Sequence, residues 1–277
     1  MGLRINTNVV SLSAQRALGI SNSQKERSLE KLSSGTRIVR AADDAAGLAI
    51  SEKLKGQIRG AKQAQRNAGD GISLIQVAEG GLSEISNILV RLRELSMQAA
   101  TDTVGDPERE FTNKEYQNLK QEVERISQVT EFNGKKLLNG EGELYDFQIG
   151  INNNDFQDRI QFNAGNMAAG VSALGVEGLD VSSKAGAQEA LGVLDDAIQN
   201  VSGQRSELGA KQNRLTSTIN NIQITTENLS SANSRIRDTD FAEETARNTR
   251  LNILSNAGTS VLAQSNAHGS AALKLIG

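Results

Sequence analysis

The sequence has no cysteine, no tryptophan and one proline, Pro107, in 277 residues. Without cysteine there is no disulfide, no thiolate metal site and no cysteine nucleophile. Aromatic residues make up only 3% of the chain, so bulky side chains for an ordinary globular core are scarce. The one histidine, His268, leaves no nucleophile–base pair and no metal-ligand set to argue from. We therefore expect no enzyme and no cofactor.

Charge and hydropathy exclude further classes of protein. The net charge is −3, which gives no reason to expect nucleic acid as a partner. No apolar run approaches the roughly 18 residues that a membrane-spanning helix needs. The first residues, "MGLRINTNVVSLSAQRAL", lack the apolar block of a cleavable secretory signal. We expect no membrane span, and either a cytosolic chain or export by a route that reads no cleavable signal.

The residues that are abundant favour long helices. In the second half of the chain an apolar residue recurs at every seventh position, while about half of the companion positions are polar. This spacing predicts a helix over roughly 187–237, about 75 Å long, with a weak coiled-coil seam. The seam of this helix consists of Leu194, Val201, Leu208, Leu215, Ile222, Leu229 and Ile236.

A helix of that length needs a long partner, and the first half of the chain supplies one. Apolar residues between Leu54 and Ala99 form two adjacent stripes at helical spacing, so this face is wide enough to meet two helices. A second, shorter helix follows, with Asp106 in the N-cap position and Pro107 at the first helical position. Its apolar positions run from Tyr116 to Thr130, which predicts a helix that turns back along the first.

Between roughly 133 and 180 the pattern changes to that of strands. Tyr145, Phe147 and Ile149 alternate with polar residues, "INNND" is a turn signal, and Ile160 and Phe162 alternate again after it. These residues predict a small β-hairpin. The fold class is therefore mainly α, a long antiparallel coiled-coil helical bundle with a small β-hairpin insert.

The two chain ends carry weaker seams that contain Gly, Ser and His. Neither end buries enough apolar area by itself to offset an ordering cost of about 1–2 kcal/mol per residue. We expect both ends to be disordered in the free monomer and to become ordered only against other chains. The terminal seams comprise Ile5, Val9, Leu12, Leu251, Leu254, Val261 and Leu275.

Long segments of the chain resemble bacterial flagellin. They are "LSSGTRIVRAADDAAGLAISEKLKGQIRG" (32–60), "DGISLIQVAEGGLSEISNILVRLRELSMQAA" (70–100), "TEFNGKKLLNG" (130–140) and the stretch from "LGAKQNRLTSTINN" to "SVLAQSNA" (208–267). The resemblance implies a short form without variable outer domains. It also implies a structural subunit that polymerises non-covalently, as a homo-oligomer, into the extracellular filament of the bacterial flagellum for swimming motility.

The resemblance further implies a division into domains. The two ends, 1–40 plus 238–277, would pair as a discontinuous terminal helical domain in the filament core. Residues 41–237, with the hairpin region at about 133–180, would form a helical rod. In "AADDAAGLAI" (41–50), Asp43 and Asp44 lie among small residues near the start of this rod. One interpretation is simple capping of the following helix, and the other adds contact with a neighbouring subunit.

Partners also follow from the resemblance. Secretion would use the flagellar type III export apparatus, with a cytosolic export chaperone that covers roughly 238–277. The filament cap and the hook-junction proteins would be further partners. Host innate immune receptors can recognise flagellins, and the residues that match a Toll-like receptor contact are Arg91, Leu95 and Glu115.

Two other classes share the long heptads. A coiled-coil signalling or adaptor protein would have no reason for the hairpin insert or for weak, small-residue ends. A hook–filament junction protein belongs to the same export class, but it joins or caps and does not grow indefinitely. Salt-triggered growth of long filaments from purified monomer separates a flagellin from both.

Overall fold

A computed structural model of the chain describes residues 7–274, and the side chains of 7–267. Ile5 and Leu275 of the predicted terminal seams, and the side chain of His268, lie outside the described residues. The elements in chain order are α1 (Val9–Ser34), α2 (Ala45–Ala99), α3 (Asp106–Val129), β1 (Glu131–Phe132), β2 (Lys135–Lys136), β3 (Leu144–Gln148), β4 (Arg159–Asn163), the 3₁₀ helix η1 (Ala164–Met167), α4 (Lys184–Arg237) and α5 (Phe241–Lys274).

The chain forms two compact units. One is built from both chain ends, Met1–Gly56 with Asn228–Gly277, and the other from Gln57–Glu227. Both division points fall inside helices, α2 and α4, rather than in loops.

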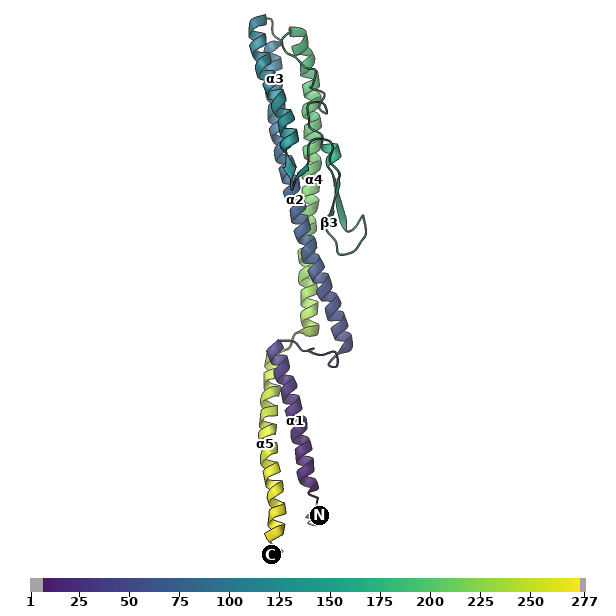
Figure 1. Ribbon diagram of the computed structural model, residues 1–277, viewed down its shortest axis with the longest axis vertical. Coiled ribbons are helices and arrows are strands. Elements are labelled where there is room, and N and C mark those ends of the chain that lie inside the picture. Colours follow the sequence, from purple (N-terminus) through teal and green to yellow (C-terminus); the bar gives the residue numbers. More distant parts are fainter. Residues whose placement is uncertain (1–6, 275–277) are drawn as a thin grey trace. The chain divides into compact units, whose positions relative to one another are not determined.

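In the unit Gln57–Glu227, the helices α2, α3 and α4 run side by side (Figure 1). Ion pairs join their outer edges. Arg91 of α2 contacts Glu115 of α3 at 2.8 Å, and Arg93 of α2 contacts Asp195 of α4 at 2.6 Å. Because α2 and α4 pair with opposite chain directions, the predicted antiparallel helical bundle is confirmed.

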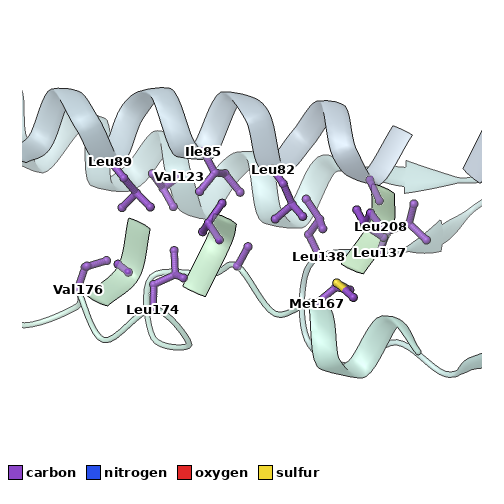
Figure 2. Close-up of a cluster of buried hydrophobic side chains, with 14 of the residues drawn as sticks. Leu82, Ile85, Leu89, Val123, Leu137, Leu138, Met167, Leu174, Val176 and Leu208 are labelled. Atoms are coloured by element: carbon purple, nitrogen blue, oxygen red, sulfur yellow. The ribbon is translucent and has the colours of Figure 1, made fainter. Parts of the chain in front are cut away.

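The core of this unit is a continuous row of Leu, Ile, Val and Ala. Leu82, Ile85 and Leu89, drawn from both predicted stripes of α2, are fully buried. Figure 2 shows these side chains pointing toward the segment that carries Met167, Leu174 and Val176. Both stripes are therefore used, as expected for a helix that meets more than one partner.

The heptad seam of α4 is buried unevenly. Its first four residues are fully buried and belong to the core cluster, whereas its last three are only half-buried. The buried four are Leu194, Val201, Leu208 and Leu215, and the half-buried three are Ile222, Leu229 and Ile236.

The predicted β-hairpin is present. Strands β3 and β4 pair antiparallel, with Tyr145 opposite Phe162 and Phe147 opposite Ile160. A second ladder, β1 with β2, was not predicted. It turns at Asn133 and Gly134, both of which have positive φ angles, 51° and 75°. An Asn-Gly pair between strands is a strong signal for a two-residue hairpin turn, so "FNGK" carried the information.

The start of α3 corrects one prediction. The N-cap is Gly105 and not Asp106, which is already the first helical residue. The carboxylate of Asp106 accepts a hydrogen bond from Nη1 of Arg109 at 2.8 Å instead of capping the backbone. The Arg109 guanidinium is buried and also donates to the carbonyls of Ala99 and Thr101. It thereby satisfies carbonyl groups that the end of α2 leaves unpaired.

Candidate subunit interface

Helices α1 and α5 of the terminal unit lie side by side (Figure 1). Short polar side chains connect them. Asn8 caps α1 by accepting from the Ser11 amide at 3.1 Å, and its side-chain amide donates to the Ser265 carbonyl at 2.9 Å. The cross-helix hydrogen-bonded pairs are Asn8 with Ser265, Ser11 with Asn266, Asn22 with Ser255, and Ser28 with Glu244.

The seam between these two helices is small and polar. Within the described side chains of α1 and α5, one large apolar residue is buried, Leu251 at 5% exposure. The other buried positions are Ser11, Ser28, Glu244 and Ser265. Gly258 lies close to α1, since a Cβ added there would be 3.2 Å from Cδ1 of Leu18. Small side chains thus let the two backbones approach each other.

The larger apolar side chains of the pair face outward. Of the predicted terminal seams, Val9, Leu12, Leu254 and Val261 are at least half exposed, and Leu251 is the exception. Further exposed apolar residues on these two helices are Val10, Ile20, Leu29, Phe241 and Ile253. An apolar surface of this kind, on a helix pair whose inside is polar, is typical of a site that another protein covers. We call these exposed residues the outer apolar face.

The stretch "AADDAAGLAI" forms the start of α2. Asp44 caps this helix, because its Oδ1 accepts from the Gly47 amide at 2.8 Å. Asp43 accepts from the amides of Arg40 and Val39, and the bond from Arg40 is the main cause of its lowered pKa. The capping interpretation is therefore confirmed. All five alanines of this stretch are exposed: Ala41, Ala42, Ala45, Ala46 and Ala49. The exposed surface at the start of α2 therefore carries mostly methyl side chains.

The three candidate receptor residues do not share one environment. Arg91 and Glu115 are half exposed and form an ion pair, which Glu94 joins at 3.0 Å. The bond to Glu115 is the main cause of the raised pKa of Arg91. Leu95 instead lies in the core at 2% exposure. Arg91 and Glu115 are therefore accessible at the surface, whereas Leu95 is covered by the packing beneath them.

This difference predicts the stability of the variants. We expect Leu95→Ala to lower the unfolding free energy by about 2–5 kcal/mol, because it leaves a cavity in the core. Arg91→Ala is expected to cost far less, since exposed ion pairs contribute little to stability. Urea unfolding followed by circular dichroism measures both. Equal losses for the two variants would contradict this assignment of Leu95 to the core.

Residues 7–267 contain no group of three His, Asp or Glu side chains placed to hold a metal ion. Within the same described part, no helix is long and apolar enough to cross a membrane. The arrangement offers surfaces for protein contact.

Comparisons with known proteins agree with this arrangement. The family description "bacterial flagellin N-terminal helical region" matches residues 5–143, and "bacterial flagellin C-terminal helical region" matches residues 191–276. A flagellin of Halalkalibacterium halodurans is 45% identical over 98% of this chain and 99% of its own length. A flagellin of Bacillus subtilis is 43% identical over 99% of this chain and 100% of its own length.

Solved structures give the same result for the fold. The crystal structure of Bacillus cereus flagellin is 31% identical, covers 57% of this chain and 88% of that chain, and has a TM-score of 0.51. A putative flagellar hook-associated protein from Vibrio parahaemolyticus covers 71% of this chain and 100% of that chain, with a TM-score of 0.58. The hook-associated protein is only 16% identical to this chain, so this match shows a similar fold and nothing more.

Proposed function

The chain belongs to the bacterial flagellin family and is a structural subunit of the flagellar filament, and we propose that its end helices α1 and α5 become ordered only by docking among copies of the same chain. The observation that carries the proposal is the outer apolar face of this helix pair, which stays exposed when α1 and α5 pair with each other.

The energetic argument starts from what the isolated pair buries. Leu251 is the one large apolar side chain buried among the described residues of α1 and α5. Ordering each residue costs about 1–2 kcal/mol, and burying one large apolar side chain contributes only about 1.5–3 kcal/mol. A pair with so little apolar burial gains too little to be stable alone. Contact with neighbouring copies would add the burial of Val9, Leu12, Leu254 and Val261.

We assign residues 1–40 plus 238–277 to the filament-core domain and residues 41–237 to the helical rod. Helices α1 and α5 fall in the first range, and α2, α3 and α4 fall in the second. On this assignment the terminal seams are the subunit interface. Their members Ile5 and Leu275, outside the described residues, are included on sequence spacing alone. The heptad seam of α4, by contrast, holds the rod together within one copy.

The other partners are part of the same proposal. The filament lies outside the cell, and we propose that the chain reaches it through the flagellar type III export apparatus. An export chaperone would cover roughly 238–277 beforehand, because Phe241, Ile253, Leu254 and Val261 expose apolar area there. The filament cap and hook-junction proteins would be further partners. Recognition by a host Toll-like receptor would use Arg91 and Glu115, with Leu95 supporting them from the core.

Amide hydrogen exchange tests the coupling of folding to assembly. In dilute monomer we expect amides of α1 and α5 to exchange almost as fast as in an unfolded peptide, while amides around Leu82–Leu92 exchange slowly. In salt-grown filaments the α1 and α5 amides should become protected, because their opening then requires loss of intersubunit contacts. Slow exchange before residue 35 and after residue 245 in the dilute monomer would contradict the proposal.

A further inference from the structure

The most exposed large apolar side chain of the described residues is Phe156, at 89% exposure. It lies in the loop between β3 and β4, which extends away from the helices in Figure 1. Leaving a phenylalanine in water forgoes about 1.5–3 kcal/mol of burial. Nothing within the single chain compensates for this exposure of the Phe156 ring.

The loop holds Phe156 in place. The carboxylate of Asp158 is buried and accepts hydrogen bonds from the amides of Asn152 and Asn154. The side chain of Asn154 in turn accepts from the amides of Phe156 and Gln157, at 3.1 and 3.2 Å. The aromatic ring is therefore presented by a backbone that is hydrogen-bonded on both sides, and it is not part of an unstructured tip.

A second feature of the same unit is a cavity of about 310 Å³ between α3 and residues 171–177. The residues that line it are Gln117, Lys120, Gln121, Glu124, Val171, Ser172 and Glu177. Their polar ends are partly engaged already, since Lys120 donates to the carbonyls of Glu177 and Leu179, and Glu124 accepts from the Val171 amide at 2.9 Å. The aliphatic stems remain to line the cavity, which is large enough for a phenyl ring.

Phe156 does not reach this cavity within its own chain. The hairpin is fixed to α2 near Gly60, where an added Cβ would be 3.0 Å from Ile151. The cavity lies on α3 just after Glu115, which pairs with Arg91 of α2. Along α2, the attachment of the hairpin near Gly60 and the level of the cavity are roughly 25 residues apart, which is about 35–40 Å at 1.5 Å per residue. Phe156 and the cavity therefore do not meet within one chain.

We propose that Phe156 of one copy inserts into the α3 cavity of a neighbouring copy. The inference rests on the chain being a filament subunit, and it names one contact that joins rod to rod. Two different surfaces on each copy make a heterologous contact, which continues from copy to copy and suits an open-ended polymer.

Cross-linking tests the contact directly, because the chain has no cysteine of its own. In filaments of the double variant Phe156→Cys with Gln121→Cys, we expect mild oxidation to join most subunits into a disulfide ladder on non-reducing gels. The matched control is Phe156→Cys with Asp196→Cys, which places the second thiol on an exposed part of α4. Intact filaments with no more cross-linking than this control would overturn the proposal.

Assembly supplies the second measurement. Phe156→Ala should fold like the parent chain, since the ring contacts solvent in the monomer, but its critical concentration for filament growth should rise about tenfold or more. Phe156→Leu should recover part of this loss, and Gln157→Ala in the same loop should stay within about twofold. An unchanged critical concentration for Phe156→Ala would refute the contact. Failure of the parent chain itself to form filaments would refute the proposed assembly instead.

Discussion

Deletion of residues 241–277 is expected to abolish filament growth while most of the helical structure of the monomer remains. The deletion removes all of α5, and with it Leu254, Val261 and the hydrogen-bonded partners of Asn8 and Ser28 on α1. The unit Gln57–Glu227 keeps its own core cluster, which takes no residue from the deleted segment. Electron microscopy and sedimentation after seeding in salt measure the loss of growth, and circular dichroism measures the retained helix.

Deletion of residues 1–40 should also abolish filament growth, because we expect α1 and α5 to form the filament core only when they pair with each other. The matched controls are shorter truncations, of residues 1–4 and of 276–277, which keep α1, α5 and the terminal-seam residues Ile5 and Leu275. These controls show how much of the loss belongs to the helices themselves. Filaments from either long truncation would contradict the assignment of the chain ends to the filament core.

Leu208→Ala is expected to cost about 2–5 kcal/mol of monomer stability, whereas Leu229→Ala should cost roughly 1 kcal/mol. Both residues belong to the same heptad seam of α4, so sequence spacing alone does not separate them. Leu208 is fully buried in the core cluster beside Leu137 and Met167 (Figure 2), and Leu229 is only half-buried. Leu208→Ala is expected to lose more stability because the removed side chain leaves a cavity in the closely packed core.

Chemical denaturation of the two variants at equal concentration, below the threshold for filament growth, measures this difference. The midpoint should fall strongly for Leu208→Ala with an unchanged slope, because the unfolded state is unaffected. Ile224→Ala, at a 62% exposed position of the same helix, serves as the control and should lie within about 0.5 kcal/mol of the parent chain. Comparable losses at Leu208 and Leu229 would mean that the seam is buried evenly.

Periodicity predicted the elements well because it reports which residues share a face. It predicted α2, α4 and the β3–β4 hairpin, with Tyr145 and Phe147 on one side of the strand. It did not predict how deeply each position is buried. Burial of the α4 seam depends on α3 and on residues 164–181, which add a further layer over part of the bundle and come from distant parts of the sequence.

The terminal helices show the same limit at the candidate interface. Spacing placed Leu251, Leu254 and Val261 on one seam, but it did not say what that seam meets. In the structure Leu251 faces α1, while Leu254 and Val261 face outward. Hydrogen bonds such as that from Ser11 to Asn266 join residues far apart in the chain, and no local pattern indicates them. The exposed Phe156 was also missed, because strand alternation stops before the loop that carries it.

The polar seam between α1 and α5 has a calorimetric consequence. The heat capacity change of unfolding follows mainly the apolar area that becomes exposed, and this helix pair, even where it forms, buries very little apolar area of its own. Scanning calorimetry of the monomer will therefore record the unit Gln57–Glu227 almost alone. The missing heat capacity of the terminal unit will appear only when whole filaments dissociate on heating.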